Sequence, residues 1–255
     1  MKKYSRASFV LACLFVTGCF LLLGCSVKEN RAECPCLLVL EFDKTDTLLT
    51  EPVNLIVAAE GEVLYADVVM PPYDSCVLKV PKDVMEVSVW HGDDDLSIPY
   101  GCECPSLYMH SFVADTRCER FVQKVDLHKN HCCLTILVEG CEKLPYSLTL
   151  HGNVDGYEID GEPSDGEFSC VAYPEHDGEA VVRLPRQMDD SLILEVDDGS
   201  FVTRYFALGE YLAAGGYDWS EENLQDVTVI LDYFLTYVRI VVQGWEQEHV
   251  YDVIL

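Results

Sequence analysis

The chain alternates short apolar runs with polar breaks, and this pattern sets the expected fold. The runs are rich in β-branched or aromatic residues and are separated by Gly, Pro and Asp, as strands and their turns usually are. Clear examples are residues 37–42 (LLVLEF), 53–58 (VNLIVA), 77–80 (VLKV) and 84–90 (VMEVSVW). No stretch keeps a long helical period, so the pattern predicts an all-β protein.

The order of these runs is repeated once along the chain. The matched pairs of segments are 36–42 (CLLVLEF) with 133–139 (CLTILVE), 52–57 (PVNLIV) with 145–150 (PYSLTL), and 77–82 (VLKVPK) with 182–186 (VRLPR). Three matches in the same order predict two tandem antiparallel β-sandwiches of about 100–125 residues each. We place the two domains at residues 34–128 and 129–255, because the polar stretch 126–131 (DLHKNH) lies between the repeats.

The second half is expected to close with three strands and one short helix. The strands are predicted at residues 227–233, 237–242 and 249–255. The helix is predicted to begin at Ser220, because serine is a good N-cap and two acidic residues follow it in the first turn.

The N-terminus has the layout of a secretory signal. Lys2, Lys3 and Arg6 make it basic, and no charged residue follows between residues 7 and 27. This apolar run is long enough for a membrane-spanning helix, so an uncleaved anchor is one alternative, and secretion without a lipid is another.

The end of the apolar run favours a lipoprotein. Residues 22–25 (LLGC) resemble the bacterial lipobox, in which a small residue precedes a cysteine whose thiol is acylated. We therefore expect a signal peptide at residues 1–24, cleavage between Gly24 and Cys25, and lipidation of Cys25. Residues 25–33 would then be a tether between the lipid and the first domain.

Charge excludes one class of partner. The chain carries 44 Asp and Glu against 17 Lys and Arg, which gives a formal net charge of −27 at pH 7. Phosphate contacts need clustered basic side chains, and no such cluster follows Arg6. Nucleic acid is therefore not an expected partner.

The thirteen cysteines leave their chemistry open. Cys13 and Cys19 lie in the expected signal peptide and Cys25 is assigned to lipid, so ten remain for the folded part. An even number in an exported chain permits disulfides without fixing their connectivity. Zinc binding is the alternative to disulfides for the two C-x-C pairs, at residues 34–36 and 102–104. The cysteines of zinc sites are usually spaced more widely.

Signatures of catalysis are absent from the sequence. It has no G-x-S-x-G, H-E-x-x-H, P-loop or G-x-G-x-x-G motif, and its seven histidines are scattered. The acidic loops at 91–95 and 155–167 are explained by Asp-Gly turns better than by calcium. The paired carboxylates used in glycoside hydrolysis cannot be recognised in this sequence, because 44 acidic residues always supply a pair somewhere. We expect no catalytic residue, metal or cofactor.

A series of short motifs carries a resemblance to a known family. The motifs are residues 25–31 (CSVKENR), 34–36 (CPC), 104–108 (CPSLY), 183–187 (RLPRQ), 208–211 (LGEY), 216–219 (GYDW), 231–233 (LDY) and 245–246 (WE). In this order they resemble the FimB-type fimbrial anchor subunits of Bacteroidales type V pili, over nearly all of the mature chain.

The resemblance implies a fold, a location and a partner. It implies two transthyretin-like β-sandwiches in a non-catalytic, lipid-anchored base that attaches a fimbria to the outer membrane and ends its growth. Ser26 and the Lys28-Glu29 step resemble surface-export signals of these bacteria. The implied partners are a fimbrial shaft subunit, bound by strand exchange, and the membrane, bound through acyl chains. Cleavage after Arg31 would release the protein from its lipid, so an anchor should resist it.

The C-terminal residues are the candidate exchanging strand, with Val250, Tyr251, Val253 and Leu255 as its expected contacts. The alternative is an ordinary edge strand of its own domain.

Two other functions remain open, a glycan-binding surface lipoprotein and a hydrolase. Glycan binding would need Trp90, Trp219 and Trp245 to line one face. The sequence around Trp90 and Trp219 favours core packing instead.

Overall fold

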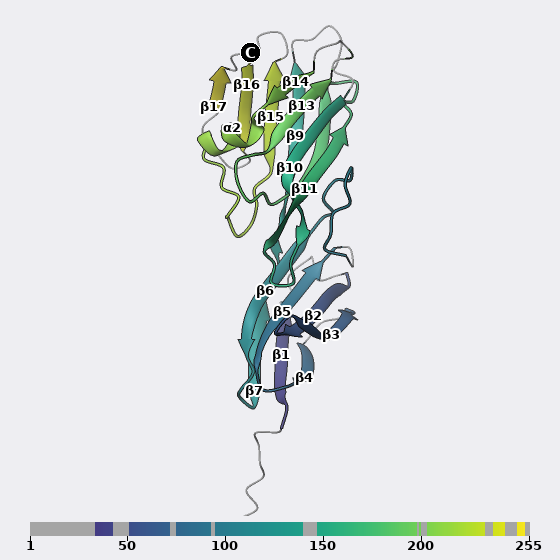
Figure 1. Cartoon of the computed structure of the whole chain (residues 1–255), viewed down its shortest axis with the longest axis vertical. Helices are drawn as coiled ribbons and strands as arrows, with labels where there is room; N and C mark the ends of the chain where they lie inside the picture. The colour runs from purple at the N-terminus through teal and green to yellow at the C-terminus, as the bar shows by residue number, and fades with distance from the viewer. Residues whose placement is uncertain are drawn as a thin grey trace, which may run out of the picture.

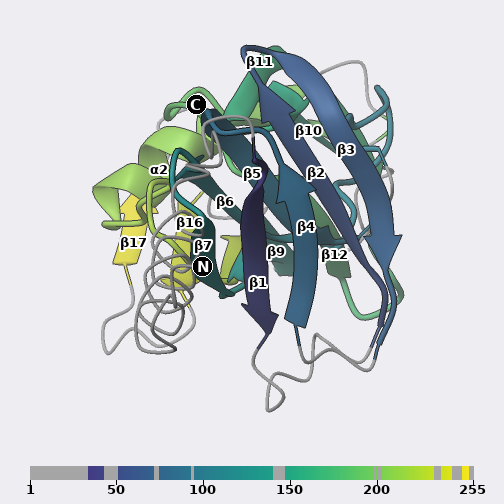
Figure 2. The same ribbon diagram turned by 90° about the horizontal axis from the view of Figure 1, so that it is seen from below.

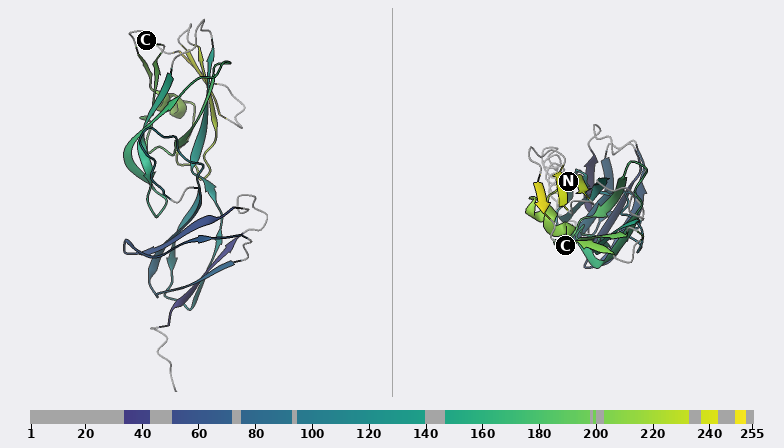
Figure 3. Two further views of the ribbon diagram at one scale, coloured as in Figure 1. Left: turned by 90° about the vertical axis from the view of Figure 1, so that its right-hand side faces the viewer. Right: turned by 90° about the horizontal axis from the view of Figure 1, so that it is seen from above.

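The protein is an elongated stack of two β-sandwiches joined end to end, as the computed structural model shows (Figures 1 and 3). The structure describes residues 34–42, 51–71, 75–92, 95–139, 147–197, 199, 203–232, 237–242 and 249–252, with side chains as far as Leu231. Strands β1 to β8 form the lower sandwich in Figure 1, and β9 to β17 form the upper one.

The first sandwich has two sheets, one of three strands in the order β4-β1-β7 and one of five in the order β3-β2-β5-β6-β8. Figure 2 shows these sheets as two layers, with β1 and β4 in front of β2, β3 and β5. The strands are β1 (Cys36–Phe42), β2 (Val53–Ala59), β3 (Glu62–Val69), β4 (Ser75–Val80), β5 (Val84–His91), β6 (Tyr108–Asp115), β7 (Arg120–Val125) and β8 (His128–Lys129).

The second sandwich has sheets in the orders β11-β10-β13-β14 and β12-β9-β15-β16-β17. Its strands are β9 (His131–Glu139), β10 (Ser147–Tyr157), β11 (Pro163–Ala172), β12 (Glu179–Pro185), β13 (Ile193–Asp197), β14 (Arg204–Phe206), β15 (Val227–Asp232), β16 (Tyr237–Val242) and β17 (His249–Asp252). The described helix, α2 (Leu208–Ala214), lies between β14 and β15 in the chain.

The two sandwiches repeat one topology. The order β4-β1-β7 of the first matches β12-β9-β15 of the second, and β3-β2-β5-β6 matches β11-β10-β13-β14. The segments paired in the sequence repeat occupy equivalent strands, so the all-β fold with two tandem sandwiches is confirmed. One pair in each sandwich is parallel, β1 with β7 and β9 with β15, while the other described pairs are antiparallel.

Each sandwich has its own apolar core, which follows from the period of two in its strands. Along β9 the side chains of Leu134, Ile136 and Val138 are buried, and the residues between them are partly exposed. They belong to the core of the second sandwich. Leu38 and Leu40 of β1 belong to a separate core in the first sandwich.

Two residues with positive φ form the turn that joins β2 to β3. Glu60 and Gly61 both have positive φ, 49° and 78°, which is the backbone of a two-residue type I′ turn. Glycine adopts this conformation at little cost, and the turn joins β2 to β3 in antiparallel register.

The prediction of a helix that begins at Ser220 is wrong. The Ser220 amide and hydroxyl both donate to the Asp218 carboxylate, at 2.8 and 2.7 Å, so the polar side chains form a turn in place of a helix cap. The helix lies earlier, at α2, where Gly209 lets the backbone pack closely. A Cβ on Gly209 would lie 2.2 Å from the Asp190 carbonyl oxygen.

Candidate functional site at the domain junction

The two sandwiches are joined by a segment of the first that lies along the second. We call residues 95–107, between β5 and β6, the strap. Its backbone amides donate to carbonyl oxygens of the second sandwich: Ile98 to Asp155 at 2.6 Å, Gly101 to Ser169 at 2.9 Å and Cys104 to Arg183 at 3.0 Å.

The strap covers one open side of the second sandwich. Its partners lie on β10, β11 and β12, and β11 and β12 are the edge strands of the two sheets. Unpaired edges are sites of unwanted association, so the strap protects this side. Its Ile98, Cys104 and Leu107 are buried within the core of the second sandwich, and this contact fixes the two domains together.

A glycine allows this close contact. Gly156 in β10 forms a bridge with Ser97 of the strap. A Cβ on Gly156 would lie 2.7 Å from the Leu96 carbonyl oxygen and 3.0 Å from the Ser97 Cα atom. Any larger residue at this position would therefore displace the strap.

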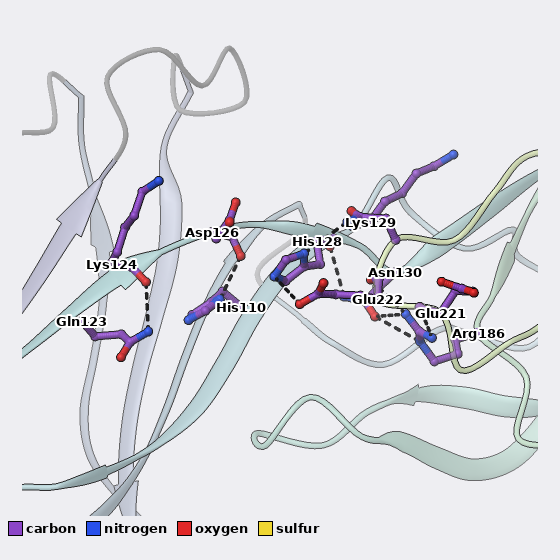
Figure 4. A network of polar contacts seen from close by, with 11 residues as sticks. His110, Gln123, Lys124, Asp126, His128, Lys129, Asn130, Arg186, Glu221 and Glu222 are labelled. Carbon is purple, nitrogen blue, oxygen red and sulfur yellow. Dashed lines mark hydrogen bonds and ion pairs between the residues drawn. The ribbon is translucent and has the colours of Figure 1, made fainter. Parts of the chain in front are cut away.

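Arg186 is the polar centre of the junction (Figure 4). Its guanidinium donates to the carbonyl oxygens of Trp219 and Glu221, the latter at 2.8 Å. It also donates to Asn130 Oδ1 through Nη2 at 3.1 Å and through Nε at 3.2 Å. Asn130 lies between β8 and β9, within the polar stretch 126–131 that we call the linker. The planar fork of Arg186 therefore holds the linker against the β15 side of the second sandwich.

Charged pairs extend this network along the linker. His128 Nε2 lies 3.2 Å from Glu222 Oε1, and the Lys129 ammonium pairs with Asp226. Asp226 also accepts the Cys133 amide at 2.8 Å, and Leu224 donates to the Lys129 carbonyl oxygen at 3.0 Å. The segment before β15 is thus bound to both linker and β9.

Two histidines lie at the junction, His131 buried and His110 partly buried, and desolvation lowers the pKa of both. The Leu107 amide donates to His131 Nδ1 at 3.1 Å, and desolvation lowers the pKa of His131. His110 Nδ1 donates to the Asp126 carbonyl oxygen at 2.9 Å, and desolvation lowers its pKa as well. The neutral form of both rings is therefore favoured where the domains meet.

A groove of about 790 Å³ lies beside Arg186. Its rim carries six acidic side chains, namely Asp160, Glu162, Asp189, Asp190, Asp218 and Glu222. Because Arg186 already donates to protein oxygens, the rim is unfavourable for anions. Within the described chain, no three His, Cys, Asp or Glu side chains are placed to hold a metal ion.

Several residues singled out in the sequence lie outside the described residues. These are Gly24, Cys25, Arg31, Cys141, Trp245, Val253 and Leu255. Val250 and Tyr251 lie in β17, which pairs with β16 of its own sheet with Val250 opposite Arg239. Whether this strand is also exchanged with a partner stays a prediction.

The two described tryptophans, Trp90 and Trp219, do not form an exposed aromatic face on which a glycan could stack. Trp90 is 2% exposed and Trp219 is 7% exposed, so both pack in the core, as their sequence surroundings predict. In this structure the nine described cysteines of the folded part form no disulfide with one another.

Sequence reasoning missed the strap and its anchor points. The motif 104–108 (CPSLY) was informative only as part of a family resemblance, although it forms the last part of the strap and the start of β6. Gly156 stands among several turn-like glycines and gives no signal of a close contact. The tie between Arg186 and Asn130 joins residues that are 56 positions apart.

Comparison with known proteins identifies the fold. No sequence family and no curated protein matches the chain. A candidate polysaccharide-binding protein from Bacteroides thetaiotaomicron matches with a TM-score of 0.61 at 14% identity, covering 86% of this chain and 98% of that one. The fimbrial anchor protein Mfa2 from Porphyromonas gingivalis matches with a TM-score of 0.58 at 13% identity, covering 83% and 98%.

A third structure agrees with these two. A candidate adhesin from Bacteroides ovatus matches with a TM-score of 0.56 at 13% identity, covering 89% of this chain and 97% of that one. These neighbours are described as binding, anchor or adhesin proteins rather than enzymes. Among the described residues, no helix has the length and apolar character of a membrane span. The chain has the fold of these Bacteroidales proteins, and the resemblance to fimbrial anchor subunits that the sequence indicates is confirmed at the level of fold.

Proposed function

We propose that the protein is a lipid-anchored fimbrial anchor subunit, which attaches a fimbria to the outer membrane and ends its growth. One observation carries this proposal: a lipobox cysteine at residue 25 precedes a chain with the two-sandwich fold of a fimbrial anchor. In this account residues 1–24 are the signal peptide and 25–33 the tether. The domains are 34–128 and 129–255, and the strap reaches from the first to the second.

Lipid suits a base that must stay on the cell surface. Each buried CH₂ group contributes about 0.8 kcal/mol, and a single chain gives only marginal binding. A lipoprotein cysteine with two or three acyl chains therefore holds the protein durably. The strap and the Arg186 network support the same role, because they make the two sandwiches one continuous body along the long axis.

The shaft subunit is proposed to bind by strand exchange at the C-terminal end. In strand exchange, backbone hydrogen bonds provide affinity, and alternating side chains provide register. β17 lies at the edge of its five-stranded sheet, where a strand can leave or be extended with the least disruption. Val250, Tyr251, Val253 and Leu255 are the residues proposed to contact the partner.

Glycan binding is the second candidate, because one structural neighbour is described as a candidate polysaccharide-binding protein. The burial of Trp90 and Trp219 weighs against it, since sugar rings stack on exposed aromatic faces. The acidic groove beside Arg186 is lined in part by Tyr217 and Trp219, but both are buried and present no open face.

Replacing Cys25 tests the anchor proposal directly. We expect a Cys25→Ala strain to release its fimbriae into the medium, because no thiol remains for acylation. The matched control is Cys34→Ala, which removes a nearby exposed thiol but keeps the lipobox. Fimbriae that stay attached in the Cys25→Ala strain would contradict the proposal. If attachment is unchanged and binding of the cells to polysaccharide is lost, the second candidate is favoured.

A further inference from the structure

Two cysteines from distant parts of the first sandwich lie side by side. The Sγ atoms of Cys36 and Cys118 are 3.9 Å apart, although the residues are 82 positions apart in the chain. Cys36 begins β1, and Cys118 lies in the turn between β6 and β7. The Leu37 amide donates to the Glu119 carbonyl oxygen at 3.0 Å, so the backbone holds both residues in place.

We propose that Cys36 and Cys118 form a disulfide in the exported protein. A disulfide needs an S–S distance of about 2.05 Å. Cys118 is exposed and lies on a turn, whereas Cys36 is fully buried at the edge of the core. The exposed side chain can therefore rotate toward the buried one without repacking the core.

The reaction is thiol–disulfide exchange with an external disulfide, either a small-molecule disulfide or an envelope dithiol oxidase in its disulfide form. The Cys118 thiolate attacks the external disulfide and releases one external thiolate. The Cys36 sulfur then attacks the Cys118 sulfur and releases the second. The two cysteines lose two electrons and two protons in total, and the external disulfide becomes two thiols. Cys118 attacks first because it is accessible, while burial raises the pKa of Cys36.

The bond would change the path of tension through the first sandwich, and this consequence rests on the proposed anchoring function. Tension from the lipid enters the fold at Cys36, and it leaves through β7 toward β8 and the junction. Because β1 and β7 are parallel, Cys36 lies at the end of this sheet remote from the junction. A Cys36–Cys118 bond passes the tension directly to the start of β7 and removes residues 37–117 from the covalent path that carries it.

Disulfide mapping tests the pair itself. The full chain is purified from cell envelopes, its free thiols are alkylated in denaturant, and the nonreduced digest is analysed by mass spectrometry. We expect a peptide pair that joins Cys36 to Cys118. Purified full-length chain treated with oxidised glutathione gives the same pair whether or not Cys25 carries lipid, so failure of anchoring and failure of this proposal are distinguishable. Alkylated Cys36 and Cys118 after both treatments, or a Cys34–Cys118 pair, would overturn the proposal.

Single-molecule pulling gives a second readout. We expect unfolding of the oxidised chain, pulled at its two ends, to release less length than that of the reduced chain. The difference is roughly 290 Å, because an extended chain spans about 3.3–3.6 Å per residue. Cys36→Ala and Cys118→Ala should each abolish this difference, and Cys34→Ala should keep it. Each protein is compared with its own reduced form, so a packing cost of the substitution cancels. An equal length in oxidised and reduced wild type would contradict the proposal.

Discussion

The backbone of Leu96 lies so close to Gly156 that a single methyl group would not fit between them. A Cβ on Gly156 would be 2.7 Å from the Leu96 carbonyl oxygen, which is shorter than any ordinary carbon–oxygen contact. This contact lies where the strap of the first sandwich pairs with β10 of the second. The attachment of one domain to the other therefore depends on the absence of a side chain.

Replacing Gly156 with alanine should detach the strap. We expect Gly156→Ala to destabilise the second sandwich by about 1–3 kcal/mol, because overpacking forces the backbone to shift. Urea unfolding measures the loss, and limited proteolysis should cut the strap faster. The matched control is Glu167→Ala, on an exposed position of β11. Equal stability and equal cleavage of the two variants would show that the strap tolerates a Cβ.

Replacing Arg186 with lysine should weaken the junction although the charge is kept. The guanidinium binds two backbone carbonyls and Asn130 at once, and an ammonium group has no such fork. We expect a loss of about 2–3 kcal/mol, because hydrogen bonds to a charged donor contribute about 1.5–3 kcal/mol each. Denaturant unfolding of the full chain measures it.

The control for Arg186→Lys is Arg117→Lys. Arg117 also forms a fork, but it binds the exposed Asp115 carboxylate at the surface. Exposed pairs contribute little, so we expect almost no change there. A similar effect of both substitutions would remove the special role assigned to Arg186.

Stability should fall as the pH falls below neutrality. The folded state lowers the pKa of His131 and His110 by burial, so the unfolded state binds more protons below the ordinary histidine pKa of about 6.5. The stabilisation is complete above that pH and is lost as the pH falls toward the folded pKa values. Urea unfolding at a series of pH values from about 7.5 to about 5 measures this slope.

Variants at His131 assign the slope. His131→Gln removes one titrating ring and keeps a side chain that can accept the Leu107 amide, so we expect a smaller slope. His176→Gln changes an exposed histidine between β11 and β12 and should leave the slope as it is in the wild type. An unchanged slope in His131→Gln would contradict the assignment.

The sequence predicts the strands of this protein well because their signal is local. Leu134, Ile136 and Val138 show the period of two that places a strand over a core. The ordered matches between the two halves predict the repeated topology, which no single strand could indicate. The sequence does not indicate which distant residues lie close together in space. Cys36 and Cys118 are far apart in the chain, and only the parallel pairing of β1 with β7 brings them together.

The helix shows the opposite case, in which a local signal was misleading. Ser220 followed by two acidic residues is typical of a helix start, but Asp218 accepts both polar groups of Ser220 and forms a turn. The real helix contains Gly209, a poor helix former. It is stabilised by contacts with the rest of the domain, since the Gly209 amide donates to the Leu192 carbonyl oxygen at 2.8 Å.

We propose that the chain is fixed to the membrane through Cys25, and the identity of the mature N-terminal residue decides whether it is. Mass spectrometry of the N-terminal peptide from purified envelopes is the measurement. We expect a peptide that begins at Cys25 and carries a thioether-linked diacylglyceryl group, with the bond after Arg31 uncleaved. A mature chain that begins at Ala32, or one that keeps residues 1–24 and has an unmodified Cys25, would contradict it.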